Sequence, residues 1–326
     1  MLRNMTTPGN KQENLGQGTD RLSVDLAGMR MSNPIMTASG TSGYGPEYAP
    51  YLDVASLGAF VTKAVSPEPR KGNSPPRTFE TPGGMLNAIG LANVGLEAFI
   101  RDKIPYLQDL GIPVIVNVAG HSVDDYLAVC EALEAQESID GLELNVSCPN
   151  VSDGLEFGTD PARLGKLLGQ IRPRVKRAKL IVKLSPNVTS ITDMARAAVD
   201  AGVDALSAVN TLRGMAVHVD KRVPMLGNNY GGLSGPAIRP VAVYMVHQVY
   251  HHVAREANVP IIGMGGINNW RDVVEFMLAG ATAVAVGTAL FGDPTTPCQI
   301  CSGLVEYLDR HGIASVTDLV GQLQTH

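Results

Sequence analysis

The chain has 326 residues, of which 44% are hydrophobic and 17% charged, so it can bury a large core and is neither disordered nor fibrous. Its formal net charge of −5 offers no basic surface for DNA or RNA, because phosphate binding requires clustered Lys and Arg. The most apolar stretch, residues 277–291, is interrupted by Gly and Thr and is too short for a membrane span of about 20 residues, so we expect neither a nucleic-acid nor a membrane partner.

Residues 1–20 are rich in Asn, Gln, Gly and Thr. They contain neither the apolar core of a signal peptide nor the apolar stripe of a membrane-anchoring helix. We therefore predict a flexible tail over residues 1–20 and a single domain over residues 21–326. The cysteines at positions 130, 148, 298 and 301 are too sparse for the disulfide framework of a small secreted protein, so we expect a cytoplasmic protein.

Short apolar runs recur along the chain, with helical stretches between them. Residues 21–31 precede the first run and alternate apolar and polar side chains, which predicts a small β-hairpin that closes the bottom of a barrel. The runs themselves are mostly apolar throughout, as is typical of parallel strands covered by helices. Eight strands are predicted: Pro34–Ser39, Ala59–Lys63, Pro113–Val118, Gly141–Asn145, Leu180–Leu184, Ala205–Asn210, Pro260–Met264 and Ala283–Val286.

The segments between these strands have the apolar spacing of helices. Asp160 followed by Pro161 is typical of a helix start, because Asp caps the first turn and Pro is favoured at the first helical position. Repeated strand-then-helix units predict an α/β fold of the (β/α)8 TIM-barrel type. The predicted helices are Val123–Ala135, Pro161–Arg172, Ile191–Ala201, Val241–Ala254 and Trp270–Ala279.

Two connections are longer than the loops of compact α/β proteins: residues 64–94 after the second predicted strand and residues 211–237 after the sixth. Both leave the carboxyl ends of strands, the face at which barrel enzymes place their active sites. We therefore expect both long loops to contribute to function.

Polar residues gather at the carboxyl ends of the predicted strands. A single Asn at such a position is most often a turn residue. Repetition at one face of a barrel favours a binding site instead. The residues are Ser39, Lys63, Asn117, Asn145, Lys183, Asn210 and Thr211.

Glycines follow the last two strands, in Gly263-Met264-Gly265-Gly266-Ile267 and in Val286-Gly287-Thr288. Gly allows the backbone to approach a phosphate closely, and the N–H groups of a following helix favour an anion. We infer a phosphorylated ligand, whose identity these residues leave open.

Lys183 lies in the apolar run Ile181–Leu184, so we expect its ammonium group inside the mouth of the barrel, where it requires an anionic partner. Two roles remain open for it. It could neutralise an electron-rich cofactor, or it could form a Schiff base with a carbonyl substrate, as in a lyase or aldolase.

Cys148 follows the fourth strand, in Asn145-Val146-Ser147-Cys148-Pro149-Asn150. A polar loop at this position places the thiol at the mouth of the fold rather than in its core, so Cys148 is a candidate base. The unperturbed pKa of a thiol is about 8.5, so a positive charge or a helix end must favour the thiolate.

Two other patterns give weaker evidence for a functional site. Cys298 and Cys301 form a lone CxxC pair near the C-terminus, too few thiols for an iron–sulfur cluster, and we expect them to be packing residues. His247 and His251 are four residues apart on a predicted helix but lack a third ligand in a recognisable pattern, so we predict no metal site.

From about Arg21 to its C-terminus the chain resembles the class 1 dihydroorotate dehydrogenases, flavin enzymes of pyrimidine synthesis. In this family the cysteine of the fourth-strand loop is the catalytic base, whereas the membrane-associated class has serine there. Cys148 therefore favours the class without a membrane anchor. The matching segments are Asn87–Leu91, Asn145–Asn150, Val182–Asn187, Val209–Thr211, Gly231–Pro236 and Gly263–Ile267.

The resemblance implies one FMN per chain and a role for each matching residue. Cys148 would remove the C5 proton of dihydroorotate while the C6 hydride passes to FMN, and Lys183 would offset the resulting negative charge. The implied FMN contacts are Ser39, Lys63, Ala64, Asn117, Asn145, Lys183, Val209, Gly235, Gly265, Gly266, Gly287 and Thr288. The implied substrate contacts are Lys63, Asn87, Ala88, Ile89, Gly90, Leu91, Asn145, Asn210 and Thr211.

No strand is followed by the GxGxxG pattern of a nicotinamide-binding unit, so electrons must leave the flavin for another molecule. Residues 85–91 are closer to the NAD-linked class 1B, which implies a homodimer core joined by a separate subunit that carries FAD and a 2Fe-2S cluster, in a heterotetramer. The alternatives are a fumarate-linked class 1A enzyme, a dihydropyrimidine dehydrogenase-like subunit, a Schiff-base lyase that uses Lys183, and a phosphate-ligand binding subunit without catalysis.

Overall fold

The computed structural model describes residues 20–147 and 157–325. The predicted tail, residues 1–20, lies outside this part of the chain except for its last residue. Cys148, Pro149 and Asn150 also lie outside the described residues. None of the helices within the two described ranges is long and apolar enough to cross a membrane.

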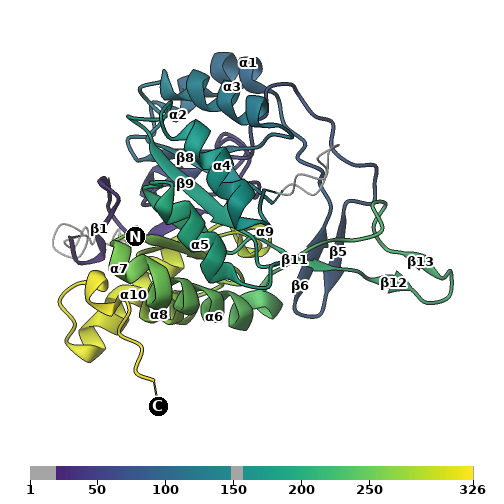
Figure 1. The fold of residues 1–326 in the computed structure, drawn as a ribbon. Coiled ribbons are helices and arrows are strands. Elements are labelled where there is room, and N and C mark those ends of the chain that lie inside the picture. Colours follow the sequence, from purple (N-terminus) through teal and green to yellow (C-terminus); the bar gives the residue numbers. More distant parts are fainter. Residues whose placement is uncertain (1–19, 148–156, 326) are drawn as a thin grey trace, which may run out of the picture.

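Eight parallel strands form the predicted barrel, with helices around it (Figure 1). Their order around the sheet is β3-β16-β15-β10-β9-β8-β7-β4, so each strand lies beside its neighbour in the barrel sequence. All eight predicted strands are confirmed, several of them shorter than expected. They are β3 (Ile35–Thr37), β4 (Phe60–Val61), β7 (Val114–Val118), β8 (Gly141–Asn145), β9 (Lys179–Leu184), β10 (Ala205–Ala208), β15 (Ile261–Met264) and β16 (Ala283–Val286).

The barrel closes between its first and second strands through few contacts. Met36 on β3 and Ala59, just before β4, form one isolated parallel bridge. The buried Thr37 hydroxyl then replaces a backbone partner, since it donates to the Val61 carbonyl at 3.0 Å and accepts from the Val61 N–H at 2.9 Å. A side chain therefore completes the hydrogen bonding where the two short strands separate.

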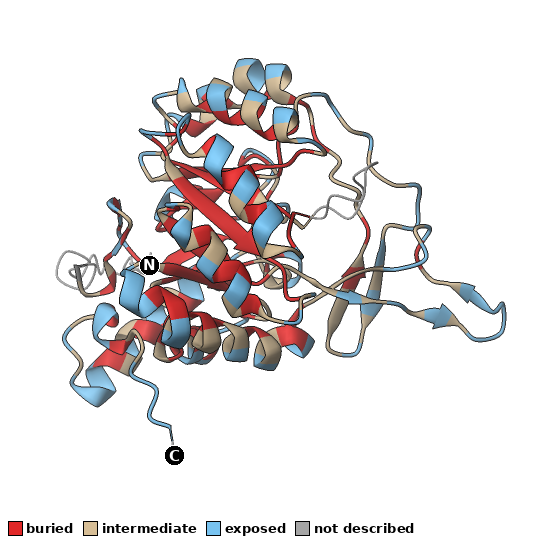
Figure 2. Cartoon of the chain, viewed as in Figure 1, coloured by how far each residue is buried: buried red, intermediate tan, exposed pale blue. Residues whose placement is uncertain are grey.

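The helices surround the strands with their apolar faces inward, so buried strands lie beneath helices whose outer faces are exposed (Figure 2). Asp160 caps its helix as predicted, with its carboxylate accepting the Arg163 N–H at 3.0 Å. The α-helices are α1 (Leu96–Asp102), α2 (Ile104–Leu107), α3 (Val123–Glu134), α4 (Pro161–Ile171), α5 (Ile191–Asp200), α6 (Arg239–Val249), α7 (Arg255–Ala257), α8 (Trp270–Leu278), α9 (Ala289–Gly292) and α10 (Thr296–His311). The short 3-10 helices are η1 (Asp20–Leu22), η2 (Val54–Ser56), η3 (Pro236–Ile238) and η5 (Val316–Leu319).

One predicted helix differs in its course. The segment predicted as a single helix over Val241–Ala254 begins earlier, as α6, and passes through a π-helical turn, η4 (Tyr250–Ala254), into α7. Pro240 fits the first turn of α6 because that turn needs no intrahelical N–H donor. The π-helical turn places Tyr250 against Gly280 and Gly321, at each of which a Cβ atom would lie within 2.4 Å of the tyrosine side chain.

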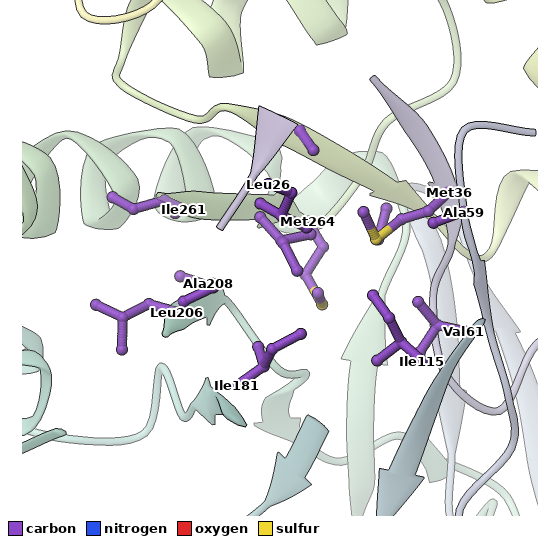
Figure 3. Packing of buried hydrophobic residues seen from close by; sticks show 14 of the residues in the cluster. Leu26, Met36, Ala59, Val61, Ile115, Ile181, Leu206, Ala208, Ile261 and Met264 are labelled. Carbon is purple, nitrogen blue, oxygen red and sulfur yellow. The ribbon is translucent and has the colours of Figure 1, made fainter. Parts of the chain in front are cut away.

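The predicted N-terminal hairpin is present as antiparallel strands β1 (Val24–Leu26) and β2 (Met29–Met31). Leu26 and Met31 are fully buried. Figure 3 shows Leu26 among the side chains of barrel strands, including Ile115 and Ile181. In Figure 1 the hairpin lies at the end of the barrel opposite to the carboxyl ends of β8 and β9, so it covers the bottom as expected.

The two long loops contain strands that were not predicted, and these strands pair with each other. Residues from both form a four-stranded antiparallel sheet in the order β11-β14-β6-β5, here called the accessory sheet. It lies on the side of the barrel where β8 and β9 end (Figure 1). Its strands are β5 (Thr78–Thr81), β6 (Gly84–Asn87), β11 (Leu212–Gly214) and β14 (Gly231–Ser234), and a separate hairpin, β12 (Val217–His218) and β13 (Val223–Pro224), extends from it.

Asn93 fastens the two ends of the first long loop together. Its side chain is 9% exposed, and its Oδ1 accepts the Gly95 N–H at 2.8 Å. Its Nδ2 donates to Ser66 Oγ at 2.7 Å and to the Leu91 carbonyl at 2.8 Å. One amide thus holds the loop where it leaves the barrel and where it returns.

We expect Asn93→Ala to lower the free energy of unfolding by about 2–3 kcal/mol, because several buried hydrogen bonds are lost and their partners remain unpaired. Urea denaturation followed by circular dichroism measures this change. Asn268→Ala, at an exposed position, is the control and should change stability by less than about 0.5 kcal/mol. Equal stability of the two variants would contradict the assigned role of Asn93.

Candidate active site

Neighbouring strands of the barrel carry polar side chains toward its interior. Asn117 comes from β7, Glu143 and Asn145 from β8, Lys183 from β9 and Ser207 from β10. Asn117 lies opposite Glu143 in the sheet register, and Asn145 and Ser207 both lie opposite Lys183. Because alternate residues of a strand face the same side, these residues share the inner face of the barrel.

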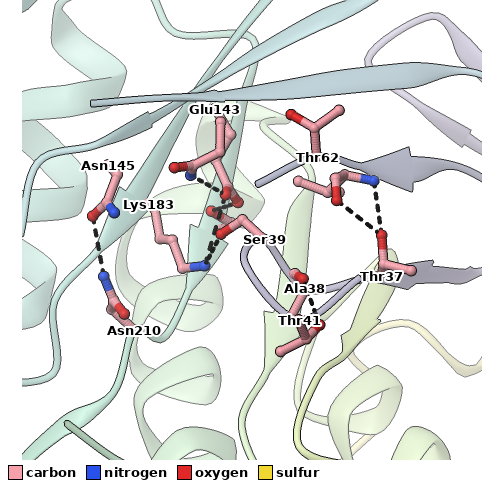
Figure 4. Close-up of polar contacts among 12 residues, drawn as sticks. Thr37, Ala38, Ser39, Thr41, Thr62, Glu143, Asn145, Lys183 and Asn210 are labelled. Atoms are coloured by element: carbon pink, nitrogen blue, oxygen red, sulfur yellow. Dashed lines mark hydrogen bonds and ion pairs between the residues drawn. The ribbon is translucent and has the colours of Figure 1, made fainter. Parts of the chain in front are cut away.

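The buried Glu143 carboxylate connects three of these side chains, those of Asn117, Lys183 and Ser207. Figure 4 shows it beside Lys183. Glu143 Oε1 accepts from Asn117 Nδ2 at 2.7 Å, and Glu143 Oε2 accepts from Ser207 Oγ at 2.8 Å. The Lys183 ammonium lies 3.7 Å from Glu143 Oε1 and donates to Ser39 Oγ at 2.9 Å. Glu143 and Lys183 are 1% and 5% exposed, so water contributes little to stabilising either charge.

The position of Lys183 matches the expectation of a buried cation with an anionic partner, but the partner was not predicted. Glu143 was not predicted because it lies inside a strand rather than at its carboxyl end. The signal was present in the alternation of Gly141, Glu143 and Asn145, which places an acidic residue on the same face as the predicted site residue Asn145.

The predicted substrate contacts on the fourth and sixth strands also meet. Asn210 Nδ2 donates to Asn145 Oδ1 at 3.2 Å, as Figure 4 shows, and Asn210 Oδ1 accepts the Thr211 N–H at 2.8 Å. The Tyr126 hydroxyl donates to the Asn145 carbonyl at 2.7 Å and fixes the end of β8.

Asn117 has the property expected of a ligand contact. Its Nδ2 is bonded to Glu143, whereas its Oδ1 is buried and has no hydrogen-bond partner among the described residues. A buried acceptor left unpaired costs about 1–3 kcal/mol, so such a group fits a bound molecule that donates an N–H. The Asn117 amide therefore fits a bound molecule that carries a hydrogen-bond donor.

The predicted phosphate cradle is assembled from three segments. Gly265 and Gly266 have φ angles of 126° and 79°, which disfavour other residues. A Cβ atom at Gly266 would lie 2.7 Å from the Gly235 carbonyl oxygen, so glycine allows these two turns to meet. Thr288, which follows Gly287 after β16, donates to Ser234 Oγ at 2.8 Å and joins the third segment.

Other predicted contacts lie around the same mouth without joining the Glu143 network. Burial lowers the pKa of Lys63, and the nearby Glu47 acts in the opposite direction. Ala64 and Val209 are buried, and the Ala64 carbonyl accepts from the Tyr44 hydroxyl at 3.2 Å.

The predicted substrate segment, residues 87–91, begins at the last residue of β6 in the accessory sheet. The Ile89 carbonyl accepts the Asn73 N–H at 3.1 Å, and the Asn73 side chain donates to the Ala88 carbonyl at 3.0 Å. Leu91 has a positive φ of 55°. Asn73 thus holds the segment by its carbonyls, while Asn87 Nδ2 donates to the Gly232 carbonyl at 3.4 Å and Ala88 is buried in a small apolar cluster.

Two further patterns noted in the sequence are the CxxC pair on α10 and a pair of histidines on a helix. Cys301 on α10 is half-buried, and desolvation together with the nearby Cys298 raises its pKa to about 12. His247 and His251 stack at 5.8 Å between ring centroids. No group of three or more His, Cys, Asp or Glu residues is placed to bind a metal within residues 20–147 and 157–325.

Known proteins match this chain over more than nine tenths of its length. A family model described as dihydroorotate dehydrogenase matches residues 21–308. A protein of Geotalea uraniireducens named dihydroorotate dehydrogenase B (NAD(+)), catalytic subunit, is 53% identical over 94% of this chain and 100% of its own length. Proteins of the same name from Pelobacter propionicus and Desulforudis audaxviator are 53% and 51% identical, over 93% and 92% of this chain and 98% and 97% of their own lengths. The chain therefore belongs to the dihydroorotate dehydrogenase family.

Proposed function

We propose that this chain is the catalytic subunit of an NAD-linked dihydroorotate dehydrogenase, which oxidises (S)-dihydroorotate to orotate in the de novo synthesis of UMP. One observation carries the proposal: Lys183 and Asn117 both contact Glu143 inside the barrel, where they offer a buried positive charge and an unpaired acceptor. The relatives that carry this name match almost their full length, which supports the choice of substrate and acceptor.

Bound FMN would accept the hydride that leaves C6 of dihydroorotate. The residues of the mouth suit such a cofactor, because Asn117 offers an acceptor, Lys183 a positive charge and the glycine turns an uncrowded backbone for a phosphate. We propose one FMN per chain. Its contacts would be Ser39, Lys63, Ala64, Asn117, Asn145, Lys183, Val209, Gly235, Gly265, Gly266, Gly287 and Thr288.

The substrate contacts follow from the donors and acceptors beside this site. Asn145 and Asn210 are fixed by their mutual hydrogen bond and can pair with the ring amides of dihydroorotate. Lys63 offers a cation for the carboxylate, and residues 87–91 approach from the accessory sheet. Thr211, next to Asn210, is the last of the proposed substrate contacts.

Cys148 is the proposed base that removes the C5 proton. It follows Asn145 closely in sequence, although it lies outside the described residues. The Lys183 ammonium would offset the negative charge that develops beside it, which is an electrostatic rather than a covalent contribution. Cys148 would thus accept the proton, and Lys183 would stabilise the negative charge that the hydride transfer produces.

The proposal requires a second subunit. We propose that FAD and a 2Fe-2S cluster reside on that partner and that a homodimer of this chain forms the core of a heterotetramer. The name of the relatives, in which this chain's counterpart is one subunit and NAD(+) the acceptor, supports this arrangement. A cytoplasmic location agrees with three described cysteines that form no disulfide.

The alternatives are less well supported. An ammonium group held against a carboxylate has no free electron pair with which to attack a carbonyl, so the Glu143–Lys183 contact disfavours a Schiff-base lyase. The relatives' names favour the NAD-linked over the fumarate-linked class. Assay with NAD and with fumarate, in the presence of the co-expressed partner subunit, distinguishes these two classes.

We expect the purified chain to contain oxidised FMN that dihydroorotate bleaches under anaerobic conditions and that dihydrouracil does not. The comparison separates the proposal from a dihydropyrimidine dehydrogenase-like activity, because both substrates share the ring but only one has the carboxylate. Stopped-flow absorption measures the bleaching. A colourless protein that borohydride traps as a Lys183 adduct would instead establish the lyase.

We expect Cys148→Ala to retain FMN but to reduce it about 10²- to 10⁴-fold more slowly with dihydroorotate, the usual contribution of a positioned base. In the unmodified chain the rate should rise between about pH 6 and pH 9 as the thiolate fraction grows. Cys298→Ala, at an exposed cysteine on α10, is the control and should keep the normal rate. Unchanged reduction in Cys148→Ala, or a flat pH profile, would exclude a thiol base.

A further inference from the structure

The Glu143 carboxylate has no assigned part in the proposed reaction, yet it occupies the centre of the site. It is 1% exposed, and both of its oxygens have partners, on β7 and β10. Burying a carboxylate is unfavourable unless it is paired, and a hydrophobic residue of similar volume would often be as stable. Stability alone therefore gives a weak reason for an acidic residue at this position.

The contact with Lys183 gives a stronger reason. The Lys183 ammonium lies 3.7 Å from Glu143 Oε1 in a region that excludes most water. Opposite charges interact strongly at this distance and at low effective dielectric constant. Glu143 therefore cancels much of the positive field that Lys183 directs at a ligand in the mouth.

The contact with Asn117 adds a second effect. A carboxylate only accepts hydrogen bonds, so Glu143 selects the orientation in which Asn117 donates through Nδ2. Asn117 Oδ1 then faces away from Glu143, buried and without a partner. One residue thus orients an acceptor and moderates a cation that both border the proposed FMN site.

We infer that Glu143 is a positioning residue that lowers the reduction potential of the bound flavin by offsetting the charge of Lys183. This inference rests on the proposed function. Reduction places negative charge on the flavin, which an uncompensated Lys183 would stabilise further. With Glu143 in place the reduced flavin remains a strong enough reductant to pass electrons toward a low-potential acceptor such as NAD.

The matched pair of variants is Glu143→Gln and Ser207→Ala. Glu143→Gln removes the charge, while its amide can still accept from Asn117 and donate to Ser207. Ser207→Ala removes one hydrogen bond to the same carboxylate and leaves its charge in place. A purely structural role would make the two variants similar, whereas a charge effect separates them.

We measure the midpoint potential of bound FMN by equilibration with a reference dye, and the affinity of the apoprotein for FMN by titration. We expect Glu143→Gln to shift the equilibrium toward reduced flavin at least tenfold, or about 30 mV for a two-electron couple. Ser207→Ala should remain within a few millivolts of the unmodified protein. An unchanged or lowered potential in Glu143→Gln, or an equal shift in both variants, overturns the inference.

Glu143→Asp keeps the experiment decisive if Glu143→Gln does not fold. The shorter side chain retains the charge but withdraws it from Lys183, so we expect a smaller rise in the potential, and no rise contradicts the inference. Failure of the proposed function gives a different result. In that case the unmodified chain itself would bind no FMN or would not be reduced by dihydroorotate.

Discussion

The site depends on one buried ion pair, between Glu143 on β8 and Lys183 on β9. Neither charge has much access to water, so each must be satisfied by protein groups, which come from the flanking strands β7 and β10 and from Ser39 after β3. Because Asn117, Glu143, Lys183 and Ser207 belong to adjacent parallel strands of one barrel, their positions follow from the sheet register.

The remaining parts of the site depend on this centre in different ways. Asn117 takes its orientation from Glu143, and its unpaired Oδ1 is the consequence. The accessory sheet brings residues 87–91 to the carboxyl side of the barrel, and its attachment depends on Asn93 rather than on the ion pair. The residues around the proposed FMN site and residues 87–91, which we propose to contact the substrate, are thus held in place by different segments of the chain.

Much of this arrangement could be predicted from the sequence. The eight barrel strands were identified because parallel strands are apolar on both faces, and Lys183 stood out because a cation interrupted such a run. The accessory sheet was not predicted. Its strand β5 alternates exposed and half-buried residues, and its pairing joins segments far apart in the sequence. Glu143 was not predicted because it lies inside β8 rather than at its carboxyl end, and the π-helical turn at Tyr250 has no local sequence signal.

The most direct measurement is a crystal structure of the chain with FMN and orotate bound. We expect the flavin ring in the barrel mouth, with the Lys183 ammonium against it, Asn117 Oδ1 accepting a hydrogen bond from its ring N–H, and the phosphate at the turns of Gly265 and Gly266. A flavin bound elsewhere, or a Lys183 side chain directed away from the ring while Asn117 Oδ1 remains unpaired, would contradict the account.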